Sequence, residues 1–147
     1  MFLTGIVFYF VIIITTILLG ADLRWFIDFP SFKYILLSNI ALLITTNSIK
    51  NFAYGIKLLI VKNIEVDSDK IKESIEVFSL LNRASLVISI LGVLIGLIGM
   101  CGKLEEPSSL GVYMAVLLLV PFYSAMANIM IIKPAKFMLI KIQRGLN

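Results

Sequence analysis

The sequence predicts an all-α integral membrane protein with four transmembrane helices and both termini in the cytoplasm. Of its 147 residues, 60% are hydrophobic, and the mean hydropathy is +1.03, whereas soluble domains are typically about half apolar. Two stretches, residues 84–100 and 110–132, contain no charged residue. Each matches the roughly 20 apolar residues that a membrane-spanning helix needs. The chain is therefore expected to lie in a lipid bilayer as a single membrane domain.

The first two spans are expected at residues 2–20 and 32–49. Residues 2–20 carry no charge and lack the basic segment and short apolar core of a cleavable signal, so we expect a retained span. The turn that follows contains Trp25, an aromatic residue suited to the headgroup zone. The second span is the most polar of the four and includes Asn39. We expect its helix to continue beyond the membrane through Phe52.

Residues 50–83 form the only sizeable polar segment and are expected in the cytoplasm. Asp67 and Asp69 offer an N-cap and an anionic first turn for a helix. Ile71 and Phe78 would lie on one face of that helix. The charges of this segment have two interpretations, a solvated helix that leads into the third span or a docking surface for a partner, and the sequence leaves both open.

The third and fourth spans are expected at residues 84–100 and 110–132, followed by a cytoplasmic tail at 133–147. Small residues recur along the third span at steps of four and three residues and form one seam, which consists of Ser85, Ser89, Gly92, Gly96 and Gly99. Such a seam lets another helix approach closely, from the same chain or from another subunit. Pro107 suits the first position of the fourth helix, and Pro121 inside that helix implies a kink.

The distribution of Lys and Arg gives the orientation of the spans. In a four-span arrangement most of the 13 basic residues lie on one side of the membrane, namely Lys50, Lys57, Lys62, Lys70, Lys72, Arg83, Lys133, Lys136, Lys141 and Arg144. Only Arg24, Lys33 and Lys103 lie on the other side. Because cytoplasmic loops carry the excess of basic residues, both termini and residues 50–83 are placed in the cytoplasm.

Composition argues against several classes of function. The net charge of +4 and the pI near 9.3 are compatible with nucleic-acid binding. The basic residues, however, flank apolar runs instead of covering one face, so we expect no nucleic-acid partner. The chain has no His and a single cysteine, Cys101, which argues against an internal disulfide framework and against a metal site. We expect no cofactor, and we do not expect an enzyme.

Four short sequences carry a family resemblance. The fourth span contains Ala115-Val116, Tyr123 and Ala127-Asn128, followed by Pro134. The other three sequences are I-D-F-P-S at residues 27–31, G-V-L-I-G-L-I at 92–98 and E-P-S-S-L-G at 106–111. In this order and spacing they resemble the MotA/TolQ/ExbB family of ion-driven motor subunits, whose fourth span reads A-V-A-L-x-T-T-x-Y-G, then A-N and P. Four spans resemble the MotA branch more than the three-span TolQ and ExbB branches.

The resemblance implies a homopentamer in a bacterial inner membrane, whose third and fourth helices line a central pore. The pore would hold the helices of a dimeric single-span partner similar to MotB, ExbD or TolR, with an intramembrane Asp. Ion flow would rotate the pentamer around this partner. The residues expected along the ion path are Ser89, Gly92, Val93, Gly96, Val120, Pro121, Tyr123 and Ser124. Those expected in helix packing are Gly92, Gly96, Gly99, Ala115, Ala127 and Asn128.

Two departures from the family pattern bear on function. Val93 occupies the third-span Thr position and Val120-Pro121 the fourth-span Thr-Thr pair, so hydroxyls expected near the ion path are absent. The cytoplasmic segment is also much shorter than in flagellar stators, which favours a dedicated partner system over flagellar work. The leading interpretation is a channel-forming subunit of a proton-driven, force-transmitting complex. The alternative is a non-conducting pentameric scaffold that positions a partner.

A third class, a self-sufficient four-span exporter, can be weighed from the residues alone. Proton-coupled exporters need a titratable group within the membrane. None of the four apolar runs contains an acidic residue. Any proton carrier is therefore expected to come from a partner.

Overall fold

A computed structural model describes residues 2–61, 66–104 and 107–145 of the chain. Over these residues the protein is helical and contains no β-strand. Three helical stretches are long and apolar enough to cross a membrane, namely Leu23–Thr45, Ser68–Cys101 and Leu110–Arg144. The chain is therefore an all-helical, membrane-embedded protein. Lys62, which entered the charge count, and Glu106, which opens one family motif, lie outside the described residues.

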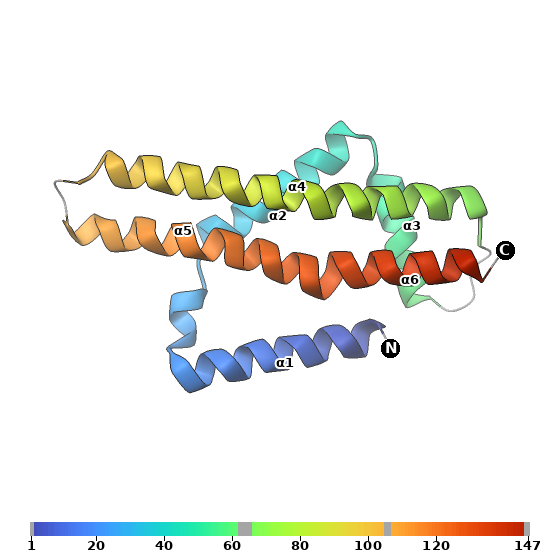
Figure 1. Ribbon diagram of the computed structural model, residues 1–147, viewed down its shortest axis with the longest axis horizontal. Helices are drawn as coiled ribbons and strands as arrows, with labels where there is room; N and C mark the ends of the chain where they lie inside the picture. Colours follow the sequence, from blue (N-terminus) through green and yellow to red (C-terminus); the bar gives the residue numbers. More distant parts are fainter. Residues whose placement is uncertain (1, 62–65, 105–106, 146–147) are drawn as a thin grey trace.

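Two long helical segments form the frame on which the other helices pack. In chain order the elements are α1 (Phe2–Gly20), η1 (Leu23–Phe26), α2 (Phe29–Thr45), α3 (Ile49–Ile60), α4 (Ser68–Cys101), α5 (Pro107–Ala127), η2 (Asn128–Ile132) and α6 (Lys133–Arg144). η1 is a 3₁₀ turn and η2 is a π-helical turn. In Figure 1, α4 and the continuous α5–η2–α6 segment form a long antiparallel hairpin. α2 lies behind this hairpin, α3 crosses it near the end of α6, and α1 lies below it.

A hydrophobic core lies where α3 crosses α4 and α6. It consists of Leu43, Val77, Phe78, Leu81, Ile132, Ala135 and Leu139. Gly55 permits the crossing, because a Cβ at this position would lie 2.8 Å from Cε2 of Phe78 and would meet side chains of α4 and α6 together. This core joins the polar ends of the long helices beyond their uncharged runs.

The helix of the second predicted span, α2, ends earlier than the sequence predicts. α2 stops at Thr45, and α3 begins as a separate helix at Ile49, so the expected continuous helix through Phe52 was wrong. The Thr45 and Thr46 hydroxyls donate to carbonyl oxygens one turn back, and Asn47 has a φ of 51°. Asn adopts the left-handed conformation more readily than most residues, and a residue in that conformation ends a helix. The turn redirects the chain across the hairpin.

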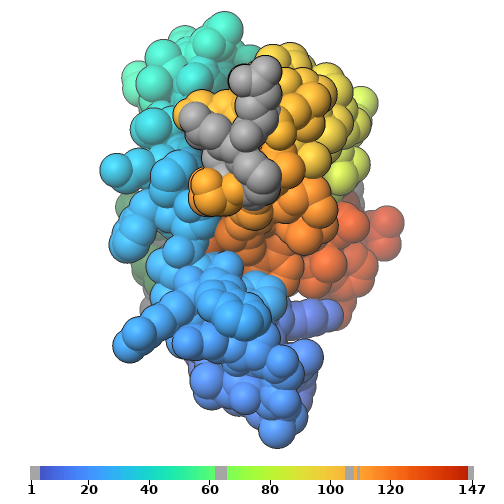
Figure 2. Space-filling view, turned by 90° about the vertical axis from the view of Figure 1, so that its left-hand side faces the viewer, coloured from blue at the N-terminus to red at the C-terminus, as the bar shows by residue number. Residues whose placement is uncertain are grey.

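The outward surfaces of the membrane helices are apolar and exposed. On α1, the side chains of Phe8 and Leu19 are 67% and 84% exposed. On α4 the exposed side chains are Leu86, Val87, Ile90, Leu91, Leu94, Ile95, Leu97 and Ile98. A continuous apolar surface of this kind faces lipid or another protein. Figure 2, viewed towards the α4–α5 turn, shows α1 and η1 (blue) as a lobe below the tip of the hairpin (yellow and orange).

Candidate functional site

Four polar side chains meet where α2, α4 and α5 pack together in the apolar part of the chain. The Ser85 hydroxyl donates to the side-chain oxygen of Asn39 (3.0 Å), and the Ser124 hydroxyl donates to the carbonyl oxygen of Ser85 (2.8 Å). The side-chain amide of Asn128 donates to the carbonyl oxygen of Ser124 (3.0 Å). We call Asn39, Ser85, Ser124 and Asn128 the polar cluster. It links three helices by hydrogen bonds without placing a charge in the membrane.

Asn128 also carries a buried acceptor that the described residues leave without a donor. Its side-chain Oδ1 receives no hydrogen bond from them, a property it shares there only with the Ser31 hydroxyl. Such an atom costs about 1–3 kcal/mol when buried. Asn128 opens the π-helical turn, in which the Lys133 N–H donates to the carbonyl oxygen five residues back. The turn directly precedes Pro134, which has no N–H to continue an α-helical ladder.

Tyr123 fastens the start of α2 to α5. Its hydroxyl donates to the carbonyl oxygen of Phe26 (2.6 Å) and accepts from the backbone N–H of Asp28 (2.8 Å). Its ring packs edge-on against Phe32, with the ring centroids 6.0 Å apart. The Asp28 carboxylate in turn accepts from the N–H of Ser31 (2.9 Å) and caps α2. The hydroxyl of Tyr123 therefore both donates and accepts a hydrogen bond within the chain.

The seam of small residues on α4 faces α5 of the same chain. A Cβ on Gly92 would lie 2.5 Å from Cγ1 of Val120, and a Cβ on Gly99 would lie 2.5 Å from Cε1 of Tyr113. Gly96 likewise faces a side chain of α5, at a somewhat longer distance. The glycines therefore allow α4 and α5 to approach more closely than any larger residue would permit.

The residues expected along the ion path all come from α4 and α5 but differ in burial. Those buried are Ser89, Gly92, Gly96, Val120 and Ser124, and those half-buried are Val93, Pro121 and Tyr123. Pro121 lies inside α5, as its sequence position predicts. Of the remaining packing residues, Ala115 is exposed, Ala127 is half-buried and Asn128 is buried. A role of these residues in ion flow stays a prediction.

The contribution of α2 to the site was not foreseen. The Tyr34 ring packs against the glycine seam, and its hydroxyl donates to the carbonyl oxygen of Ile88 (3.1 Å). Asn39 supplies the α2 member of the polar cluster. The sequence contains a signal for this face, because Ser31, Ile35 and Asn39 recur at every fourth residue. The structure buries the first two of them, which are 2% and 5% exposed. The polarity of this span is apparent from its composition, but the face that meets the hairpin was not predicted.

The geometry is thus a close-packed hairpin with an uncharged polar cluster at its contact with α2. The sequence matches no protein-family model, and no curated protein is significantly similar to it. The resemblance to the MotA/TolQ/ExbB family therefore rests on the four sequence motifs. Among the described residues, no group of His, Cys, Asp and Glu could hold a metal ion.

Proposed function

We propose that the protein is the channel-forming subunit of a proton-driven, force-transmitting complex of the MotA/TolQ/ExbB kind in a bacterial inner membrane. Five copies would surround the single-span helices of a dimeric partner. Each copy would cross the membrane four times, with both termini in the cytoplasm. α1 has 19 residues and a length of about 28 Å, so it would supply one of the four spans.

The observation that carries this proposal is a largely exposed stripe along α5, which we call the outward stripe. It is interrupted at Phe122, whose ring packs against Phe26 of η1. Its members follow helical spacing and are exposed except for the half-buried Phe122, and they are Gly111, Ala115, Leu118, Phe122, Ala125 and Ile129. Nothing lies within 4 Å of a Cβ built on Gly111, whereas the glycines of α4 are covered by their own chain. Small exposed residues on a membrane helix permit the close approach of another helix. The outward stripe would receive a neighbouring subunit or the partner helix.

The long helices support the force-transmitting part of the proposal. α4 runs without interruption from Ser68 to Cys101, so residues 68–83 extend about 24 Å beyond the uncharged run. α6 lies beside this extension, and α3 crosses both in the buried core. A displacement of the membrane part would therefore be carried into the polar part by continuous, packed helices.

A proton suits this chain better than sodium. Sodium must exchange its water shell for several fixed oxygen ligands. Val93 and Val120 stand where the family has hydroxyls, which leaves few such ligands. A proton needs only a titratable group and an intermittent path of water or hydroxyls, and the partner's intramembrane Asp would supply the titratable group.

A non-conducting pentameric scaffold is the second candidate, and the hydroxyl contacts favour it. The Tyr123 hydroxyl is bound on both sides to the junction of η1 and α2, and the Ser124 hydroxyl is bound to the Ser85 carbonyl oxygen. Either hydroxyl would have to break a contact that holds helices together before it could pass a proton. In this alternative the same shape positions a partner without ion flow.

Native mass spectrometry of the complex isolated from its own membrane tests the assembly. A pentamer with two copies of a single-span protein is expected, and a stable monomer or dimer would contradict the proposal. Gly111→Leu should release the partner or dissociate the pentamer, because it places a large side chain on the outward stripe. Gly5→Leu is the matched control, because Gly5 also has nothing within 4 Å of a Cβ but lies on α1. Equal effects of the two changes would exclude the outward stripe as an interface.

Dependence of activity on the proton or sodium gradient distinguishes the proton channel from the non-conducting scaffold. For a proton channel, activity should collapse with a protonophore, persist without sodium and disappear when the partner's intramembrane Asp is replaced by Asn. Activity indifferent to both gradients would support the scaffold, and strict sodium dependence would contradict the proton.

A further inference from the structure

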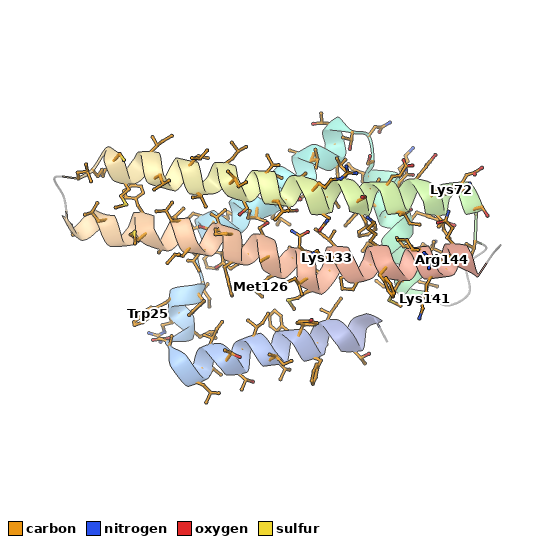
Figure 3. All side chains as sticks on the ribbon, viewed as in Figure 1. Trp25, Lys72, Met126, Lys133, Lys141 and Arg144 are labelled. Atoms are coloured by element: carbon orange, nitrogen blue, oxygen red, sulfur yellow. The ribbon has the colours of Figure 1, made fainter. Side chains whose placement is uncertain are left out.

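The turn between η1 and α2 lies beside the middle of the uncharged hairpin. The Tyr123 hydroxyl of α5 is bonded to both sides of this turn, at the Phe26 carbonyl oxygen and the Asp28 N–H. Tyr123 follows Leu110, where the uncharged run begins, by about 20 Å of helix and precedes Lys133 by about 15 Å. Figure 3 accordingly shows the start of α2 between the start of α5 and the labelled Lys133. The turn therefore lies near mid-depth of a hydrocarbon core about 30 Å thick.

The contacts of α2 with α4 give the same depth. The Tyr34 hydroxyl donates to the carbonyl oxygen of Ile88 (3.1 Å), and its ring lies 2.8 Å from a Cβ built on Gly92. Ile88 and Gly92 belong to the uncharged run of α4, about 8 and 14 Å beyond Arg83. Asp28 precedes Tyr34 by six residues of the chain. α2 therefore meets the hairpin well inside the uncharged run and not at its outer end.

This placement brings a carboxyl group to a depth that the sequence does not reveal. Asp28 lies between two apolar runs in the sequence, outside the expected spans, but the fold sets it beside a third run. Ionisable residues within a membrane are rare and mark ion or proton pathways. Asp22, Arg24 and Lys33 are exposed, whereas Asp28 is half-buried. Asp28 is thus the carboxyl group of the turn that the packing of the helices partly encloses.

The surroundings of Asp28 favour the neutral form of its carboxyl group. It borders a crevice between α1 and α5 whose other lining residues are hydrophobic, apart from Tyr123. Within the described part of the chain, neither Arg24 of η1 nor Lys33 of α2 forms an ion pair with it. α1 and α5 carry no charged residue. An ionised carboxylate without a cation is costly in an apolar setting, and binding a proton removes that charge.

A buried hydroxyl beside Asp28 lacks a hydrogen-bond partner. The Asp28 carboxylate accepts from the backbone N–H of Ser31 (2.9 Å). The Ser31 side chain is 2% exposed, and its hydroxyl forms no hydrogen bond with the described residues. A protonated carboxyl group has an O–H to donate, whereas an ionised one only accepts. A proton on Asp28 would therefore remove the charge and also supply a donor for the Ser31 hydroxyl oxygen.

We propose that Asp28 is a proton-binding site of this chain near mid-membrane depth. The proton binds to one carboxylate oxygen, so that the remaining C=O still caps α2 and the new O–H donates to Ser31. Release returns the same proton to water, which reaches the turn past the exposed Asp22, Arg24 and Lys33. A use of this site in ion flow rests on the proposed function. The channel subunit would then contribute a carboxyl group of its own beside that of the partner.

Infrared spectroscopy of the purified chain in liposomes, without any partner, tests the site. The wild type should show the C=O stretching band of a protonated carboxyl group at neutral pH, and Asp28→Asn should remove it. Asn is also a good N-cap, so this variant should keep α2. Asp67→Asn is the matched control, because Asp67 caps α4 in the polar part of the chain, and it should leave the band in place. Absence of the band in the wild type, or its persistence in Asp28→Asn, would overturn the proposal.

The hydrogen bond to Ser31 has its own spectroscopic readout. Ser31→Ala removes the acceptor of the new O–H, so the C=O band should move to higher wavenumber. The change deletes a hydroxyl that has no partner among the described residues, so the melting temperature should not fall. Ser38→Ala, a half-buried position on the same helix, is the control and should leave the band where it is. An unmoved band in Ser31→Ala would overturn the assignment of Ser31 as the acceptor.

The use of the site in ion flow is measured separately. Asp28→Asn should abolish the protonophore-sensitive activity of the complex, while native mass spectrometry shows the same assembly as in the wild type. Full activity of Asp28→Asn would overturn the role of Asp28 in ion flow. Failure of the wild type to form a pentamer would instead contradict the proposed function, and it would leave the infrared result on the single chain unaffected.

Discussion

Replacing Gly92 by Ala tests how closely α4 and α5 are packed. The new Cβ would lie 2.5 Å from Cγ1 of Val120 and 2.8 Å from Cε1 of Tyr34, whereas nonbonded carbons prefer about 3.5–4.0 Å. Val120 is 1% exposed and β-branched, so its side chain cannot rotate away freely. Tyr34 is held by its hydrogen bond to the carbonyl oxygen of Ile88 (3.1 Å). Neither neighbour can yield without losing a contact of its own.

The magnitude of this change follows from two opposing effects. An extra carbon forced into a filled contact costs about 1–3 kcal/mol. Exchanging Gly for Ala in a helix returns about 1 kcal/mol. Gly92→Ala should therefore lower the free energy of unfolding by about 0–2 kcal/mol. Gly5→Ala, where the new Cβ meets nothing within 4 Å, should raise it by up to about 1 kcal/mol. Thermal unfolding in detergent, followed by far-UV circular dichroism, compares the two variants.

A double-mutant cycle assigns the effect to one contact. Val120→Ala deletes the methyl groups that the Cβ at position 92 would strike. Gly92→Ala should therefore cost less in that background, with a coupling energy of about 0.5–3 kcal/mol. If Gly92→Ala is as stabilising as Gly5→Ala, or if the two changes simply add, the close contact between α4 and α5 is refuted.

Three further predictions address the polar cluster, the topology and the start of α4. Asn39→Ala removes the acceptor of the Ser85 hydroxyl and should lower the melting temperature. The free energy of unfolding should fall by about 0.6 and at most about 1.7 kcal/mol, as for other hydrogen bonds between membrane helices. An unchanged melting temperature would show that this hydrogen bond does not stabilise the fold. Cys101 is exposed and should react with an impermeant thiol reagent from outside intact cells, so reaction only after permeabilisation would overturn the proposed topology. The side chain of Lys70 and the backbone N–H groups of the first turn of α4 hold the pKa of Asp67 below its ordinary value of 3.8. Because this pKa is lowered by folding, the cap stabilises α4 above that value and is lost as the pH falls through the folded-state pKa. The protection factors of the first-turn amides, which compare the observed exchange rate with the intrinsic rate at the same pH, should fall only below pH 3.8. Asp67→Ala should abolish this fall, whereas a fall at higher pH would contradict the assignment.

The parts of the fold that local chemistry decides could be predicted from the sequence. Uncharged apolar runs are sufficient to identify long membrane helices, because the bilayer sets their length. The N-cap at Asp67 is confirmed, because a carboxylate before a helix satisfies its free N–H groups. α5 begins at Pro107, as expected for a residue with no N–H to leave unpaired.

The parts decided by contacts between distant segments could not be predicted. Apart from the recurrence of Ser31, Ile35 and Asn39 at every fourth residue, the pattern of α2 does not show which of its faces meets the hairpin, so the role of Tyr34 emerged only with the fold. The end of α2 depends on the backbone conformation of Asn47, which a Thr-rich sequence does not specify. The small-residue seam predicted close packing, but spacing alone did not say whether its partner was another subunit or α5.

The π-helical turn at Asn128–Ile132 has a consequence for changes in chain length. A π turn contains one residue more than an α-helical path through the same stretch. A single-residue deletion within α4 would rotate every later side chain by about 100° and turn its buried face away from α5. Deletion of the exposed Ile129 would instead convert the π turn into an α turn and leave the buried side chains of α6 in place. Deletion of one residue should therefore be better tolerated at this point than elsewhere in the long hairpin.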